Sequence, residues 1–110
     1  MEEIEINKEN ALIAAQQYAE IILSRFNNVQ IYLFGSYLKG TNNNESDIDI
    51  TVVFSDYTNL LDIQLELMKL RRKIDSRIEP HPLRKEDFTQ SNPLAFEISA
   101  NGKQLYKNIA

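Results

Sequence analysis

Two aspartates lie in a run of residues that is otherwise typical of a buried β-strand. The run is "DIDITVVF", residues 47–54. Residues i and i+2 of a strand share a face, so Asp47 and Asp49 are expected to point together while the intervening isoleucines point into the core. Adjacent carboxylates repel each other near neutral pH, and a hard, oxygen-preferring ion such as Mg²⁺ would remove that repulsion. The alternative is a pair of solvated aspartates on an exposed strand face.

A Gly-Ser pair ends the preceding apolar stretch, "VQIYLFG", which we predict to be a strand over 29–35. A strand that ends in glycine and turns at once into a short helix leaves free backbone N–H groups, which favour phosphate. Gly35 would allow close approach of a ligand, and Ser36 would add a hydroxyl donor. A phosphate cradle followed by a metal-binding pair fits a metal-bound nucleoside triphosphate. Taken alone, the Gly-Ser pair is better explained as a plain turn.

The remaining pattern predicts a single domain over residues 1–110, with an α/β or α+β fold, a small mixed sheet and helices mainly on one face. Asn7 is the expected N-cap of the first helix. Pro93 and Gly102 are expected to start and stop the last one. Two prolines should confine the third strand to an edge or a strand end. The expected elements are helix 7–25, strands 29–35 and 47–54, helix 59–73, strand 76–83, helix 93–101 and a strand or tail from 103.

The helix expected over 59–73 carries two apolar stripes, which is more than contact with one sheet requires. One stripe holds Leu60, Ile63, Leu67, Leu70 and Ile74, and the other holds Leu61, Leu65 and Met68. The first interpretation is a helix wedged between two core elements. The second is that one stripe faces a partner protein.

Composition limits the classes of function. A net charge of -4 disfavours binding to long nucleic acid. The lack of cysteine excludes disulfides and thiolate sites. We find no secretory signal at the start and no apolar run of the ~20 residues needed to cross a bilayer, so we expect a cytoplasmic protein without a membrane partner.

The stretch "GSYLKGTNNNESDIDI" has Gly-Ser, ten residues and then Asp-x-Asp. It resembles the signature of the DNA polymerase β-like nucleotidyltransferase superfamily, and the chain looks most like its minimal nucleotidyltransferase (MNT) domains. The superfamily has a third carboxylate on the strand after the long helix, which corresponds here to Glu79, although Asp is more usual there. Relatives commonly carry Arg where this chain has Lys39, which would bind phosphate as a point charge.

The resemblance implies an enzyme that transfers a nucleoside monophosphate to a hydroxyl acceptor, with ATP as the usual donor. Asp47, Asp49 and Glu79 would be catalytic and would hold two Mg²⁺ ions, with Glu79 also taking up or orienting the acceptor's proton. The implied nucleotide-binding residues are Gly35, Ser36 and Lys39. Ser46 is expected to be a loop cap with a secondary phosphate contact, and His81 a solvated strand-end residue.

MNT domains are commonly paired with a HEPN-type toxin, which they neutralise by binding and, in some systems, by AMP transfer to a tyrosine. From the short stretch after Glu79 we expect no second, acceptor-binding domain, and we therefore expect an acceptor that is brought by another subunit or is itself a docking protein. Two alternatives stay open. One is a non-catalytic antitoxin. The other is a small-molecule transferase of the aminoglycoside-modifying kind, which would need a homo-oligomer to build its acceptor pocket.

Overall fold

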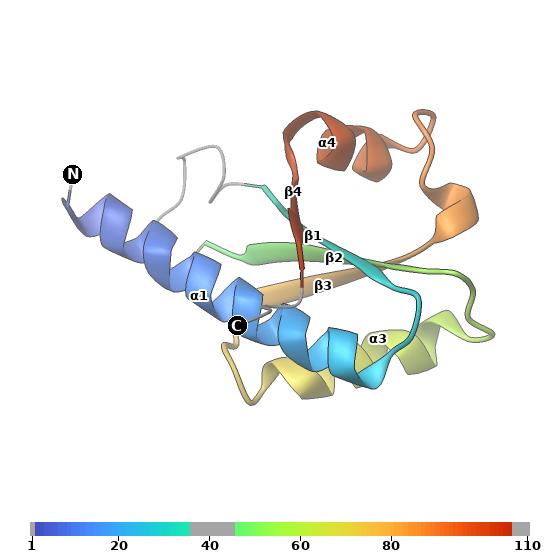
Figure 1. Ribbon diagram of the computed structural model, residues 1–110, viewed down its shortest axis with the longest axis horizontal. Helices are drawn as coiled ribbons and strands as arrows, with labels where there is room; N and C mark the ends of the chain where they lie inside the picture. Colours follow the sequence, from blue (N-terminus) through green and yellow to red (C-terminus); the bar gives the residue numbers. More distant parts are fainter. Residues whose placement is uncertain (1, 36–45, 107–110) are drawn as a thin grey trace.

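The computed structural model describes residues 2–35 and 46–106 and contains a four-stranded mixed sheet (Figure 1). The strand order is β3-β2-β1-β4, in which β1 is antiparallel to β2 and β4, and β2 is parallel to β3. The predicted mixed sheet is therefore confirmed. The strands are β1 (Gln30–Phe34), β2 (Ile48–Phe54), β3 (Ile78–Arg84) and β4 (Lys103–Leu105).

The helices in this part of the chain begin and end largely where local signals put them. The Asn59 side chain accepts a hydrogen bond from the Asp62 N–H, and the Asn92 side chain accepts from two N–H groups ahead of it. The predicted Asn7 cap is wrong, because the first helix already begins at Glu2. The helices are α1 (Glu2–Arg25), α3 (Leu60–Arg71), the 3₁₀ turn η1 (Lys85–Asp87) and α4 (Pro93–Asn101).

The main core lies between one face of the sheet and helices α1 and α3. Alternation along β1 and β2 turns the isoleucines of both strands toward these helices. In Figure 1, α4 lies across the sheet from α1 and α3, so two of the three α-helices cover one face. The largest fully buried members of this core are Tyr18, Ile22, Ile31, Leu33, Ile48, Ile50, Leu67 and Ile78.

Strand β3 forms one edge of the sheet, as its prolines predict. The Ile78 carbonyl accepts a hydrogen bond from Arg71 Nη1 at 2.8 Å, and the Pro80 carbonyl accepts from Gln64 Nε2 at 3.2 Å. Both donors come from α3, so these carbonyls point away from β2. A proline at such a position removes no N–H from the ladder. Side chains of α3 therefore cover the free edge of β3.

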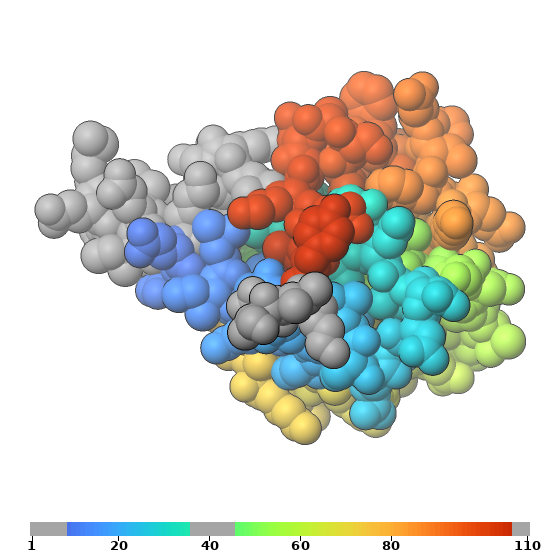
Figure 2. Space-filling model, in the orientation of Figure 1, coloured from blue at the N-terminus to red at the C-terminus, as the bar shows by residue number. Residues whose placement is uncertain are grey.

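Strand β4 forms the opposite edge and pairs only with β1 within the described sheet. Figure 2 shows its segment at the molecular surface, between residues of α1 and the C-terminal helix. The expectation of a strand or tail after Gly102 is resolved as a short strand.

None of the helices in the described ranges has the length and apolar character needed to span a bilayer.

The second stripe of α3 is partly exposed in the described part of the chain, because Leu61 and Leu65 face solvent while Met68 is half-buried. On its other side α3 packs against both α1 and β3, in agreement with the interpretation of a helix between two core elements. Leu61 and Leu65 keep 65% and 50% of their surface accessible, and Leu60 keeps 54%. Leu67 and Leu70 are buried, and Ile63 and Ile74 pack against the same core. One side of α3 thus stabilises the fold while its first two turns present leucines to solvent.

The Tyr18 hydroxyl links α1 to α3 in the core and gives a direct test of this packing. It donates a 2.8 Å hydrogen bond to the Leu67 carbonyl, and burial raises the pKa of Tyr18, so the hydroxyl remains a donor over the ordinary pH range. Tyr18→Phe should lower the free energy of unfolding by about 1 kcal/mol in urea denaturation. The control is Tyr32→Phe, whose exposed hydroxyl bonds at 3.4 Å and should cost much less. Equal effects of the two substitutions would contradict this role.

Candidate functional site

Asp49 occupies the middle of the predicted site. It lies near the start of β2, an interior strand, and its register partners are Phe34 on β1 and Glu79 on β3. Its neighbours Ile48 and Ile50 are fully buried on the other face, while its own side chain is 25% exposed. The rigid strand thus holds one carboxylate on an accessible face, as alternation predicts.

Gly35 lies directly against this carboxylate. A Cβ at Gly35 would overlap Oδ2 of Asp49 and come within 3.2 Å of its Cγ. The backbone of Gly35 also has φ +90°, a conformation that glycine adopts readily. Glycine is therefore required at the end of β1, both for its backbone conformation and for the close approach of Asp49.

His81 contacts the other oxygen of Asp49. Its Nε2 lies 3.2 Å from Oδ1, and its ring centroid lies 5.4 Å from that of Phe34. The expectation of a solvated strand-end residue is wrong, since His81 lies inside β3 and is about one-third exposed. Residues 79 and 81 share a face of β3, and this alternation is the signal that could have indicated the contact.

Glu79 lies beside Asp49 in register but is also near a cation. Its Oε2 is 4.0 Å from Nη1 of Arg71, and its side chain is 43% exposed. Arg71 also donates to the carbonyls of Ser76 and Ile78. Arg71 is not among the residues predicted from the sequence, although a basic residue in the last turn of the helix before β3 was an available signal.

The other predicted residues are described only in part. Asp47 is exposed and lies one residue before β2, and Ser46, before it, is half-buried. Ser36 and Lys39 lie outside the described residues, so their predicted phosphate contacts stay predictions. Gly35, one of the predicted nucleotide-binding residues, lies against a predicted catalytic carboxylate.

The carboxylate oxygens at and beside Asp49 are the kind of ligand that a hard divalent cation prefers, and the strand register brings them from neighbouring positions. Asp49 and Glu79 supply carboxylate oxygens from adjacent strands, and glycine keeps the space beside Oδ2 free of a side chain. Within residues 2–35 and 46–106, however, no three His, Cys, Asp or Glu side chains gather closely enough to surround one ion. Ligation by Asp47, Asp49 and Glu79 together therefore stays a prediction.

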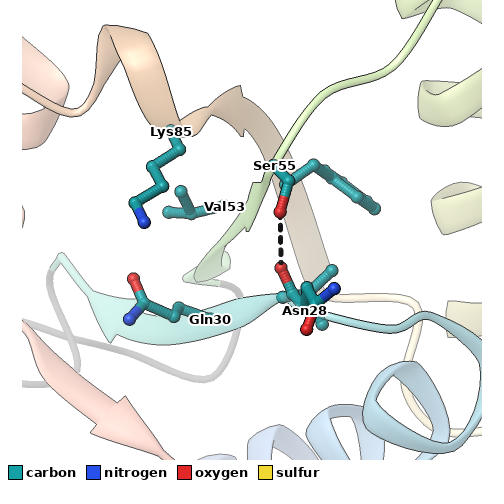
Figure 3. Close-up of a pocket in the computed structure, with 7 residues that line it drawn as sticks. Asn28, Gln30, Val53, Ser55 and Lys85 are labelled. Atoms are coloured by element: carbon teal, nitrogen blue, oxygen red, sulfur yellow. Dashed lines mark hydrogen bonds between the residues drawn. The ribbon is translucent and has the colours of Figure 1, made fainter.

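A hollow of about 320 Å³ lies at the other end of the sheet from Gly35 (Figure 3). It is lined by the start of β1 and the end of β2, with Gln30 and Lys85 extending into the same space. Two other residues that line the hollow are hydrogen-bonded to each other, since Ser55 Oγ donates to the Asn28 carbonyl at 3.4 Å. None of the predicted catalytic residues lines it, so it is separate from the site around Asp49.

The chain shares sequence with one curated relative over much of its length. Protein adenylyltransferase MntA of Shewanella oneidensis is 37% identical to it over 76 residues. These residues are 69% of this chain and 52% of the relative, so the chain spans about half the length of that protein.

Solved structures share the fold. A Sulfolobus solfataricus protein assigned to the nucleotidyltransferases matches with a TM-score of 0.64 and 26% identity, over 77% of each chain. A MntA–HpeT toxin–antitoxin structure, with two Asp-to-Glu substitutions two positions apart, gives a TM-score of 0.62 and 26% identity over 84% of this chain and 72% of the other. A toxin–antitoxin structure with AMP-PNP gives 0.59 and 27% over 93% and 74%.

The profile of the Polymerase beta, Nucleotidyltransferase family matches residues 16–109. This range includes the Gly-Ser pair, Asp47 directly before β2, Asp49 within β2, and Glu79 on β3. Since the match covers most of the sequence, the chain belongs to the polymerase beta nucleotidyltransferase family.

Proposed function

We propose that this chain is a Mg²⁺-dependent nucleotidyltransferase that moves AMP from ATP to a hydroxyl of a partner protein. The observation that carries the proposal is the contact between Gly35 and Asp49. It joins the turn expected to hold phosphates to a carboxylate expected to hold metal. The similarity to an adenylyltransferase and to a toxin–antitoxin structure with AMP-PNP supports the choice of donor and acceptor.

In the proposed reaction, an acceptor oxygen attacks the α-phosphorus and the bond from that phosphorus to the bridging oxygen of pyrophosphate breaks. Glu79 takes up or orients the acceptor's proton. Gly35, Ser36 and Lys39 hold the β- and γ-phosphates, with a secondary contact from Ser46.

Asp47, Asp49 and Glu79 are the proposed ligands of Mg²⁺, with two ions expected from the family resemblance. When bound, the metal supplies charge stabilisation for the phosphate oxygens. In the solved MntA–HpeT structure with two Asp-to-Glu substitutions, the two altered positions have the same separation as Asp47 and Asp49. This spacing supports the proposal that Asp47 and Asp49 act as a pair.

The proposed biological role is that of an MNT-type antitoxin that binds a HEPN-type toxin and modifies it in the cytoplasm, where ATP is available. The exposed leucines of α3 are the proposed docking surface, since Leu60, Leu61 and Leu65 are at least half accessible. Two neighbours of this chain are toxin–antitoxin structures, which supports a protein partner.

A second candidate is an antitoxin that acts by binding alone. The position of Glu79 near Arg71, and the absence of a three-ligand cluster in the described residues, favour it.

Incubation with labelled ATP, Mg²⁺ and the protein encoded by the neighbouring gene separates the two. Label on that protein supports transfer, while stable binding without label supports the second candidate. Label on an added aminoglycoside would contradict both.

Replacing the proposed metal ligands tests the enzyme. Asp47→Asn and Asp49→Asn should each lower AMP transfer about 100-fold or more, because loss of several kcal/mol of charge stabilisation has this effect on rate. The assay is incorporation of label from α-labelled ATP into the partner protein. Asp87→Asn, which removes an exposed carboxylate on η1, is the charge-matched control and should leave transfer unchanged. Normal transfer by both site variants would rule out the mechanism.

Replacing two exposed leucines tests the docking surface. Leu61→Lys with Leu65→Lys should weaken binding to the toxin about 100-fold, since buried apolar anchors dominate interfaces. Binding is measured by calorimetry or by co-purification, and thermal unfolding followed by circular dichroism checks the fold. Phe96→Lys on α4, where Phe96 is 59% exposed, is the matched control and should bind normally. Unchanged binding by the double variant would place the partner elsewhere.

A further inference from the structure

The two oxygens of Asp49 face two different groups. Oδ1 lies 3.2 Å from His81 Nε2, whereas Oδ2 faces the position that a Cβ on Gly35 would fill. An imidazole that carries its proton on Nε2 donates to Oδ1 and leaves the lone pairs of Oδ2 available. The contact therefore fixes the rotation of the carboxylate and decides which oxygen is presented beside the Gly35 turn.

His81 is itself held in place on several sides. Its backbone carbonyl accepts a 2.6 Å hydrogen bond from Thr51 Oγ1, and Thr51 is fully buried. Its ring packs against Phe34, which is 8% exposed and is the register partner of Asp49 on β1. Parallel pairing sets His81 beside Thr51, two residues beyond Asp49. A ring fixed in this way can orient a neighbouring carboxylate with little loss of entropy.

We propose that His81 is a positioning residue that orients Asp49 for cation binding through a hydrogen bond to Oδ1, without ligating the cation itself. The inference rests on the proposed function in one respect, namely that Asp49 binds the metal. Hydrogen-bond partners of ligating carboxylates influence affinity strongly, and their removal typically costs about 10- to 100-fold.

A matched pair of substitutions tests the position of the donor. The amide nitrogen of glutamine can occupy the place of Nε2, whereas that of asparagine is too short and corresponds to Nδ1. His81→Gln should therefore keep Mn²⁺ affinity within about 3-fold of the unmodified protein, while His81→Asn and His81→Ala should lower it about 10-fold or more. Mn²⁺ binding is measured by electron paramagnetic resonance at fixed pH without nucleotide, below the unfolding temperature of each variant.

The same experiment has outcomes that overturn the proposal. If all three variants bind Mn²⁺ as tightly as the unmodified protein does, the hydrogen bond has no effect on cation binding. An equal loss in the glutamine and asparagine variants would show that the donor's position is irrelevant. In the unmodified protein, strong ¹⁴N coupling to bound Mn²⁺ in pulsed resonance spectra would make His81 a ligand, and weak or no coupling is expected.

The test also separates this inference from the proposed function. If the unmodified protein transfers no AMP but binds Mn²⁺ with the expected dependence on residue 81, the function fails and the positioning role stands. If Asp49→Asn binds Mn²⁺ as tightly as the unmodified protein, the cation does not use Asp49 and the positioning role fails. If transfer occurs, His81→Asn should require more Mg²⁺ for half-maximal rate, with a smaller effect at saturating Mg²⁺.

Discussion

The rest of the structure depends on the difference between the two faces of β2 at its start, where one face is apolar and buried and the other carries Asp49. Ile48 and Ile50 are fully buried against the helical layer, and this fixes the register of β2 because a slip of one residue would turn Asp49 into the core. Parallel pairing with β3 then requires a long connection, which α3 supplies. The same pairing brings Glu79 beside Asp49. Packing on one face thus determines which polar groups meet on the other.

The contact between Gly35 and Asp49 shows how local backbone chemistry completes the site. Antiparallel pairing of β1 and β2 sets Phe34 opposite Asp49. The backbone of the next residue, Gly35, therefore lies directly beside the Asp49 carboxylate. Any side chain there would collide with Oδ2. A phosphate-binding turn needs the same property, since its backbone must approach a ligand closely. One glycine therefore serves the packing of β1 on β2 and the proposed chemistry.

The features predictable from sequence were those set by local pattern. Alternation identified β2 and the exposed face of Asp49, and the prolines of β3 identified an edge strand. Contacts between distant residues were harder. The alternation of β3 put Glu79 and His81 on one face, but only the register with β2 brings His81 to Asp49. Exposure of Leu61 likewise depends on what packs against α3, which periodicity alone cannot determine.

Helix α3 connects the proposed docking surface to the proposed site. Its first two turns expose Leu61 and Leu65, while Gln64 and Arg71 bond to the edge of β3. A helix rises about 1.5 Å per residue, so Leu61 and Arg71 lie only about 15 Å apart along the axis. A partner held on the leucines would therefore rest on the element that fixes the strand of Glu79 and His81. Because α3 packs on the face of the sheet opposite to the Asp49 carboxylate, such a partner would have to extend past the β3 edge to bring a hydroxyl to Asp49.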